Sequence, residues 1–314
     1  MNKLWTIPAA AAAAGTGSVY GIYRYIFHSP RGKQNDDHEL PIPIPTQEQH
    51  DRCISLIDAL NARLRERVTI SSFDGLRLTG RYFHTADGAP LAILCHGYRG
   101  TPSRDFCGGA DICLNAGFNV LMIEERAHGR SEGHTISFGV NERYDALAWT
   151  QYAAQRFGPD TKILLAGISM GAATVLMASE LDLPANVCGI LADCPYTTPE
   201  EIIAIVGEMM KFPMKLAMPF VRLAARVFGG FSLKNASAVS AVRNTKVPIL
   251  LIHGEADNLV PCGMSREIAA ANPAMIELQT FPGAGHGLSY LSDTERYTKL
   301  VLDFCERIGL RNKV

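Results

Sequence analysis

Short apolar runs alternate with amphipathic runs along most of this chain, and this alternation limits the possible folds more than any other feature. Residues 90–97 and 162–169 consist mainly of apolar residues, as is typical of strands that are covered on both faces. The stretches that follow them have apolar residues at helical spacing. Strands that alternate with helices in this way form a parallel sheet with helices on both faces. The sequence therefore predicts an α/β fold with a mostly parallel sheet of the eight-stranded type.

The order of the elements follows from the same pattern. Asp74 and Gly75 lie in the middle of residues 67–83 and predict a hairpin that joins two strands. Thr46 is a suitable N-cap for a helix whose apolar face is formed by Ile54, Ile57, Leu60 and Leu64. The other expected strands are 90–97, 118–125, 162–169, 188–194, 247–254 and 275–281, and the other expected helices are 104–116, 142–156, 264–271 and 292–308, with one directly after residue 169.

A serine stands between two glycines at the end of one predicted strand, in the segment Gly167-Ile168-Ser169-Met170-Gly171. The pattern Gly-x-Ser-x-Gly between a strand and a helix is typical of a nucleophile elbow, a tight turn that holds the serine hydroxyl above the sheet. Glycine is needed on each side because a side chain there would strike the adjacent strand or helix. The following helix directs its free N–H groups toward any oxyanion that forms at the serine.

A serine hydroxyl needs a general base, and the base needs an acid that orients it. Asp257 follows the strand at 247–254, and His286 lies in a glycine-rich loop after the next strand. Because the functional groups of a parallel sheet gather at the carboxyl ends of its strands, we expect Ser169, His286 and Asp257 to form a catalytic triad. The alternative roles are a helix cap for Asp257 and an ordinary loop position for His286.

These motifs resemble those of the α/β-hydrolase superfamily, and the resemblance extends from Val68 to Ile308. The segments HGEADNLVP and GAGHG are similar to the family segments that carry the acid and the base, which again implies Asp257 and His286. The segment HGYRGT is similar to the family's loop after the third strand. This implies an oxyanion hole formed by the backbone N–H groups of Tyr98 and Met170.

A further segment, EERAHGRSEG, resembles the family's Asp-x-Arg-Gly-His-Gly-x-Ser segment. It differs from that pattern by Glu124 in place of Asp and Ala127 in place of Gly. The similarity of the whole chain is greatest to the branch that contains monoacylglycerol lipases and serine aminopeptidase-like hydrolases. This branch includes esterases, lipases, thioesterases and peptidases.

Other polar residues near strand ends have competing interpretations. Asp193 follows its own strand and is the alternative acid, or else it supports the surroundings of the elbow. His96 and His253 each precede a glycine at a strand end and are expected to be structural, hydrogen-bonding histidines. Arg126, His128 and His134 lie in one loop; without an acidic ligand spacing such as HExxH, hydrogen bonding is favoured over a metal site.

The stretch between Pro195 and Val247 is about fifty residues long, too long for a simple crossover and too apolar for a loop. It predicts an inserted helical cap at about 196–245. Flexible methionine side chains suit a pocket for an acyl or aromatic group. The alternatives are that the methionines pack the cap onto the main domain, or that the cap contacts a membrane. The expected pocket residues are Met209, Met210, Met214 and Met218.

The start of the chain has a different composition. Residues 4–23 contain no charged residue and are largely Ala and Gly, and their length is sufficient to span a bilayer. We predict a membrane anchor within residues 1–28, with a cleaved signal peptide, and hence export, as the alternative. The basic residues that follow favour a cytoplasmic catalytic domain. A polar linker at 29–45 would connect this segment to a hydrolase domain at 46–314.

Composition excludes some classes of function. The net charge of −1 and the absence of a basic run interleaved with aromatic residues argue against nucleic-acid binding. The eight cysteines contain no CxxC pair, so a structural zinc site is not expected and buried, reduced thiols are favoured over disulfides. Cys194 lies near a strand end, but no local motif makes it a nucleophile.

The predicted activity is hydrolysis of a carboxylic ester by acyl transfer to Ser169, with a small-molecule substrate that carries an apolar acyl or aromatic group as partner and no metal or cofactor. Alternatives on the same fold are a thioesterase, an inactive binding protein and an aminopeptidase. An aminopeptidase would need an acidic group for the substrate ammonium, and the candidates are Glu200, Glu201 and Glu208. The acyl chain length and the oligomeric state are left open.

Overall fold

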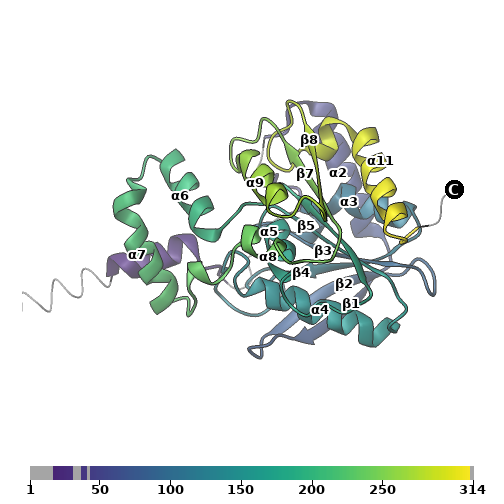
Figure 1. Cartoon of the computed structure of the whole chain (residues 1–314), viewed down its shortest axis with the longest axis horizontal. Coiled ribbons are helices and arrows are strands. Elements are labelled where there is room, and N and C mark those ends of the chain that lie inside the picture. Colours follow the sequence, from purple (N-terminus) through teal and green to yellow (C-terminus); the bar gives the residue numbers. More distant parts are fainter. Residues whose placement is uncertain (1–16, 31–36, 41–42, 312–314) are drawn as a thin grey trace, which may run out of the picture.

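The computed structural model of the chain describes residues 17–30, 37–40 and 43–311. Within these ranges eight strands form one sheet in the order β1-β2-β4-β3-β5-β6-β7-β8 (Figure 1). β1 and β2 pair antiparallel, as do β2 and β4, and every other pairing is parallel. The predicted fold class is confirmed. The strands are β1 (Glu66–Ser71), β2 (Arg77–Phe83), β3 (Leu91–Cys95), β4 (Asn119–Glu124), β5 (Ile163–Ile168), β6 (Val187–Asp193), β7 (Ile249–Gly254) and β8 (Ile276–Phe281).

Helices cover both faces of the sheet, because alternate residues of each strand point to opposite sides. On β3, Ile93 packs into the cluster that includes α4, α5, α8 and α9, whereas Leu94 packs into the cluster that includes α2, α3 and α11. The helices are α2 (Gln47–Ala62), α3 (Pro102–Asn115), α4 (Glu142–Phe157), α5 (Met170–Ala178), α6 (Pro199–Met209), α7 (Met214–Val227), the 3-10 helix η1 (Leu233–Asn235), α8 (Ala238–Val242), α9 (Gly263–Ala271), α10 (Ser289–Ser292) and α11 (Thr294–Arg307).

The expected helices and the hairpin lie close to the observed ones. Thr46 caps α2 by accepting the N–H of Gln49 at 3.2 Å, and Gly75 takes a φ of 84° in the hairpin turn. The apolar face predicted for α2 extended one turn beyond the observed end of the helix. Arg63 is extended and ends the helix, so Leu64 is 96% exposed instead of buried.

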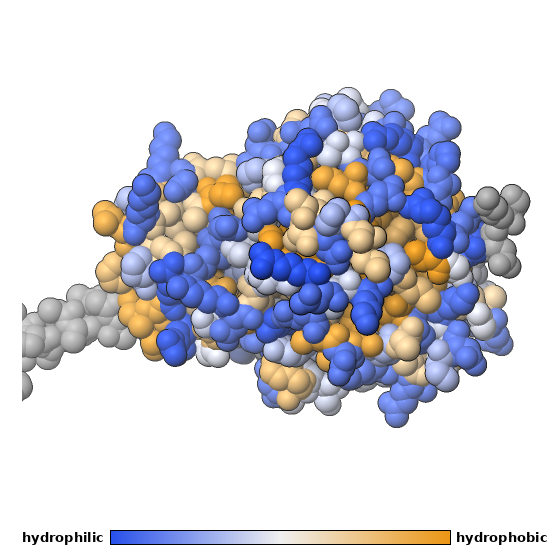
Figure 2. Space-filling model, viewed as in Figure 1, coloured by the Kyte–Doolittle hydropathy of each residue, from blue (hydrophilic) through white to orange (hydrophobic). Residues whose placement is uncertain are grey.

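The predicted cap region contains α6, α7, η1 and α8. Figure 1 shows α6 and α7 projecting from the sheet, beside the helix formed by residues 17–26. Figure 2 shows apolar side chains gathered on this end of the molecule. Large apolar residues exposed on α6, α7 and the turn between them are Met209, Met210, Phe212, Leu216, Phe220, Leu223 and Val227.

The N-terminal segment corrects one prediction. In the described ranges, no helix is both long enough and apolar enough to cross a membrane. The part of residues 4–23 that is described instead begins a helix at 17–26 that packs onto the domain. Phe27 is fully buried against the rings of Phe138 and Phe231. The predicted membrane anchor, and the cellular location that was based on it, are therefore wrong.

Parts of two predicted segments fall outside the description. These are residues 1–16 of the N-terminal segment and residues 31–36 and 41–42 of the predicted linker. The described part of the linker contacts the domain, because the side chain of Asp37 accepts hydrogen bonds from Asn61 at 3.0 Å and from Thr101 at 2.5 Å.

Candidate active site

Ser169 lies in a sharp turn between β5 and α5. Its φ of 53° and ψ of −114° are unusual for a residue with a side chain. A Cβ atom on Gly171 would overlap the carbonyl of Cys95 on β3, and one on Gly167 would overlap the carbonyl of Gly171. The two glycines are therefore required by close backbone packing, and they allow the turn to hold the Ser169 hydroxyl at the carboxyl edge of the sheet.

The structure brings Ser169, His286 and Asp257 into one hydrogen-bonded chain. Nε2 of His286 lies 2.8 Å from Oγ of Ser169, and Nδ1 of His286 lies 2.7 Å from Oδ2 of Asp257. Since a carboxylate can only accept, Nδ1 carries the proton and Nε2 is left to accept the serine proton. This is the arrangement that lets an imidazole act as a general base.

Four donors hold the carboxylate of Asp257. Besides His286, these are Nε2–H of His253 at 3.2 Å and the backbone N–H groups of Leu259 and Val260 at 2.9 and 2.8 Å. Burial alone would raise the pKa of Asp257, but the hydrogen bonds from the two histidines and the backbone lower it well below its usual value. His253 is itself fixed, because its Nδ1 lies 2.7 Å from the Ser265 hydroxyl. The predicted structural role of His253 thus includes support of Asp257.

Asp193, the alternative acid, has a different partner. Its Oδ2 accepts the hydroxyl proton of Tyr297 at 3.0 Å, and its backbone carbonyl accepts the N–H of Ser169 at 2.8 Å. Burial raises the pKa of Asp193 to about 6, although Tyr297 and the nearby histidines oppose this effect. In this arrangement Asp193 supports the elbow, and Asp257 is the acid that contacts His286.

The loop after β3 carries the predicted oxyanion donor Tyr98. The side chain of Asp105 accepts the N–H of Gly97 at 2.8 Å, and a Cβ atom on Gly97 would lie 3.4 Å from Cβ of Ser169, so this loop lies directly beside the elbow. The Tyr98 hydroxyl donates to the carbonyl of Ile26 at 2.7 Å. Met170 is the first residue of α5, and its N–H is thus one of the free donors of that helix.

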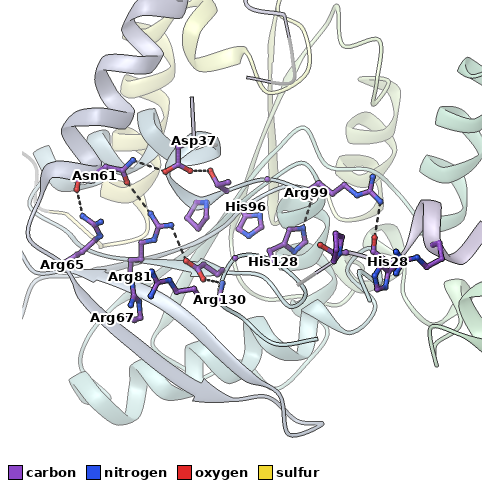
Figure 3. Close-up of a pocket in the computed structure, with 18 residues that line it drawn as sticks. His28, Asp37, Asn61, Arg65, Arg67, Arg81, His96, Arg99, His128 and Arg130 are labelled. Atoms are coloured by element: carbon purple, nitrogen blue, oxygen red, sulfur yellow. Dashed lines mark hydrogen bonds and ion pairs between the residues drawn. The ribbon is translucent and has the colours of Figure 1, made fainter. Parts of the chain in front are cut away.

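Two buried histidines, one of them in this loop, accept backbone hydrogen bonds that fix the loop and its surroundings. Nε2 of His96 accepts the N–H of Glu125 at 3.0 Å. Nε2 of His128 accepts the N–H of Arg99 at 3.0 Å, as Figure 3 shows. Burial lowers the pKa of His96 to about 4 and that of His128 to about 3, so both rings are neutral acceptors near neutral pH. These contacts are structural, as predicted for His96.

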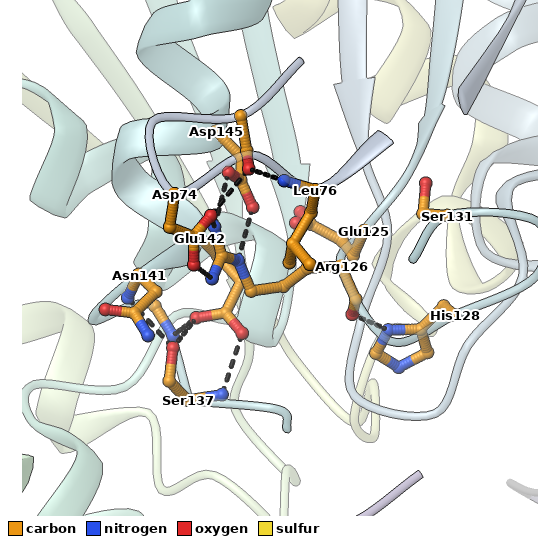
Figure 4. Close-up of polar contacts among 12 residues, drawn as sticks. Asp74, Leu76, Glu125, Arg126, His128, Ser131, Ser137, Asn141, Glu142 and Asp145 are labelled. Carbon is orange, nitrogen blue, oxygen red and sulfur yellow. Dashed lines mark hydrogen bonds and ion pairs between the residues drawn. The ribbon is translucent and has the colours of Figure 1, made fainter. Parts of the chain in front are cut away.

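The loop after β4 is fixed by Arg126 (Figure 4). Its guanidinium binds Asp145 through two hydrogen bonds of 2.6 and 2.7 Å and Asp74 through two of 3.0 and 3.1 Å. Glu124 and Ala127, the two residues that depart from the family pattern, both fit into this loop. Glu124 accepts the N–H of Arg130 at 2.6 Å, and Ala127 adopts the left-handed φ of 62° that glycine would take more easily.

The sequence matches the alpha/beta hydrolase family over residues 92–300, which is more than half of the chain. The chain belongs to this family. Among curated proteins, this alpha/beta hydrolase is similar to the uncharacterized protein YqkD of Bacillus subtilis (strain 168), with 23% identity over 278 residues that cover 88% of this chain and 89% of YqkD. It is also 27% identical over 197 residues to the esterase LipC of Mycobacterium tuberculosis, covering 57% of this chain and 46% of LipC.

A solved structure shows the same fold. The Pyrococcus furiosus esterase PF2001 matches this hydrolase with a TM-score of 0.65 at 24% identity, covering 78% of this chain and 92% of that one. Together with the family match, this confirms the superfamily and the fold that the sequence predicted. The narrower branch of monoacylglycerol lipases and aminopeptidase-like hydrolases stays a prediction.

Two cavities of the hydrolase meet at Ser169. The larger, of about 710 Å³, lies between the helix at 17–26, α6 and α7, and its walls are mainly apolar. Met210 and Met214 line it, as expected, whereas Met209 is half-exposed on the surface and Met218 packs into the hydrophobic core. Only two of the four predicted methionines thus face the cavity.

The smaller cavity, of about 340 Å³, lies on the other side of Ser169. It is formed by residues of α3, of α10 and of the segment before α2, including Leu40, Phe106 and Tyr290. Neither this cavity nor the contribution of the helix at 17–26 to the larger one was predicted from the sequence. No local motif marks such residues, because they come together only in the folded chain.

Cys194 also lies close to the candidate triad, although no sequence motif assigned it a role. Its Sγ is 4.0 Å from Nε2 of His286. Among the described residues, Cys194, Asp257 and His286 form one group whose possible metal-ligand atoms lie within 4.8 Å of one another. Burial raises the pKa of Cys194 well above its usual value. The sulfur is therefore a neutral thiol, which is a poor metal ligand and a poor nucleophile.

Proposed function

We propose that this alpha/beta hydrolase is a carboxylic-ester hydrolase that uses Ser169 as nucleophile, His286 as base and Asp257 as the orienting acid. The observation that carries the proposal is the unbroken hydrogen-bonded chain from Oγ of Ser169 through the His286 ring to Asp257, at 2.8 and 2.7 Å. Similarity to the esterases LipC and PF2001 supports an ester as substrate.

In the proposed reaction, Oγ of Ser169 attacks the ester carbonyl carbon while Nε2 of His286 takes the hydroxyl proton. The backbone N–H groups of Tyr98 and Met170 would donate to the oxyanion of the tetrahedral intermediate. Collapse of the intermediate breaks the bond to the alcohol, which takes the proton from His286 and leaves an acyl-enzyme. Water, activated by His286, then attacks the acyl carbon, and the acid is released.

The cavities favour an apolar substrate with a group on each side of the ester. The larger cavity under α6 and α7 suits a long or bulky apolar group, because it is wide and few polar atoms line it. The smaller cavity suits a shorter group. We assign the acyl chain to the larger cavity and the alcohol to the smaller one.

The aminopeptidase alternative receives no support from the contacts of its candidate residues. Glu200 is paired with Arg222 at 2.6 Å, and Glu201 bonds the hydroxyls of Thr197 and Thr198. Neither of these residues, nor Glu208, lines a cavity at Ser169. A substrate ammonium group in either cavity at Ser169 would thus meet none of these three carboxylates.

The test is hydrolysis of p-nitrophenyl esters from acetyl to palmitoyl by the wild type and by Ser169→Ala, with aminoacyl naphthylamides as a parallel series. We expect ester turnover that the variant lacks, a clear optimum of chain length, and little activity on the amides. Labelling of Ser169 by a fluorophosphonate probe provides a second readout. An absence of both turnover and labelling would reject the proposal.

A further inference from the structure

A third pocket of the hydrolase, distinct from the two cavities at Ser169, contains an unusual concentration of arginine. It has a volume of about 530 Å³ and lies behind the loop that carries Tyr98. Two carboxylates, Asp37 and Glu124, line it together with six arginines. Figure 3 shows four of these, Arg65, Arg67, Arg81 and Arg130, converging on one side of the pocket and Arg99 on the other. The sixth arginine is Arg24.

The two carboxylates already have partners. Glu124 lies 3.4 Å from Arg81 and accepts the N–H of Arg130 at 2.6 Å, and Asp37 accepts from Asn61 and Thr101. In the described part of the chain, no carboxylate lies within 4.0 Å of the guanidinium of Arg67 or of Arg130. Among the described residues that line the pocket, arginines therefore outnumber carboxylates by six to two.

The register of the sheet places two of these arginines next to each other. Arg67 on β1 stands directly opposite Arg81 on β2, and like charges in such a cross-strand pair are destabilising. On the other face of β1, the neighbouring residue Glu66 binds Arg156 at 2.6 Å. β1 thus provides a carboxylate for Arg156 on one face, whereas Arg67 on its other face has no carboxylate partner among the described residues.

We propose that this pocket binds an anion of the phosphate class. Guanidinium groups donate two parallel hydrogen bonds to phosphate oxygens, and arginines that approach from several directions suit a tetrahedral dianion. Arg67 from β1, Arg81 from β2 and Arg130 from the loop after β4 would supply these donors. A cleft in which positive charge predominates also raises the local concentration of such an anion.

The pocket adjoins the candidate active site, because Arg99 lines both this pocket and the larger cavity over Ser169. Two sources of phosphate are therefore compatible with the site. One is free phosphate, and the other is a phosphate group of an ester substrate whose apolar part lies in the larger cavity. The second source rests on the proposed esterase function, whereas the anion site itself does not.

The first experiment titrates inorganic phosphate into the full chain by calorimetry. The test variant is Arg67→Gln with Arg130→Gln, because neither guanidinium neutralises a buried carboxylate. The matched control is Arg226→Gln with Arg243→Gln, which removes the same charge from exposed positions outside the pocket. We expect saturable binding that the test variant weakens about tenfold or more and the control leaves within about twofold.

Phosphate binding that the test variant retains, or that both double variants lose equally, would overturn the proposal. This titration does not depend on hydrolysis, so its outcome is independent of the esterase proposal. Kinetics then distinguish the sources. If the phosphate belongs to the substrate, KM for a monoacyl glycerol phosphate rises about tenfold in the test variant while KM for p-nitrophenyl butyrate is unchanged. If free phosphate is the ligand, both KM values stay within about twofold although binding is lost.

Discussion

At the scale of single residues, Asp257 is held more firmly than any other polar side chain of the candidate site. Two imidazoles and two backbone N–H groups donate to its carboxylate. Its lowered pKa means that it stays ionised throughout the neutral pH range. The charge that orients His286 is therefore permanent under working conditions.

We predict that Asp257→Asn lowers kcat/KM for a p-nitrophenyl ester by about 10³- to 10⁴-fold, because an amide leaves the imidazole in the wrong tautomer. Asp193→Asn is the matched control and should stay within about tenfold, since Asp193 contacts Tyr297 instead of His286. Circular dichroism would show that both variants are folded. The opposite order of the two losses would identify Asp193 as the acid.

Asp193 predicts a pH effect on stability. Its pKa is about 6 in the folded state against an ordinary value of 3.8, so the folded state holds the proton more tightly than the unfolded state. The wild type therefore loses stability as the pH rises from about 4 to 6. The loss is about 3 kcal/mol, because a tenfold difference in proton affinity between the two states corresponds to about 1.4 kcal/mol. Asparagine does not titrate, so the free energy of unfolding of Asp193→Asn should rise by this amount relative to that of the wild type between pH 4 and pH 7. Urea unfolding of both proteins at each pH measures the difference. Parallel pH profiles would contradict the prediction.

Among single residues, the sequence identified those that belong to short motifs. Gly-x-Ser-x-Gly locates Ser169 because a tight turn requires small neighbours, and the strand ends locate Asp257 and His286. The sequence did not reveal that His253 donates to Asp257 while it is held by Ser265, because these contacts depend on how α9 packs against β7. A hydrogen bond between side chains on two elements has no local signature.

At the scale of elements, α7 has one face toward the larger cavity and one toward solvent. Neighbouring residues show the division, since Ala217 lines the cavity and Leu216 is 74% exposed. The same geometry explains why only two of the four predicted methionines line the cavity. Sequence composition indicated an apolar cap, but which methionine faces inward depends on the rotation of each helix, which composition does not determine.

We predict that Ala217→Phe shortens the accepted acyl chain, because the added ring occupies the larger cavity. Its kcat/KM for long-chain p-nitrophenyl esters should fall about tenfold or more, while that for the acetyl ester stays within about twofold. Leu216→Phe, one position earlier on the same helix, is the control and should change neither. Equal losses on short and long esters would place the acyl chain elsewhere.

At the scale of the whole molecule, the helix at 17–26 and the residues after it join parts that are far apart in the sequence. The Tyr23 hydroxyl bonds Thr135 at 2.8 Å, and the Arg99 guanidinium donates to the carbonyl of Tyr25 at 2.8 Å. The sequence predicted the parallel sheet correctly because its periodicity is local. It suggested a membrane anchor for this segment because a long uncharged run resembles a membrane span, and partners more than a hundred residues away are not visible in composition.

We predict that Phe27→Ala lowers the free energy of unfolding by about 3–5 kcal/mol, because Phe27 is fully buried. Tyr20→Ala is the control; Tyr20 is 46% exposed, and its loss should cost about 1 kcal/mol or less. Urea unfolding of the full chain measures both. A negligible effect of Phe27→Ala would mean that this segment is not an integral part of the folded domain.

The contribution of the helix at 17–26 to the wall of the larger cavity matters for how the protein is produced. Expression from residue 29 onward, a common choice when an apolar leader is suspected, would remove Ile22, Tyr25 and Ile26 from that wall. The larger cavity of such a truncated protein would lack part of its wall. Its activity would then be weak for a reason unrelated to Ser169. A purification tag is better attached after α11, which Figure 1 shows at the opposite end of the molecule from α6 and α7.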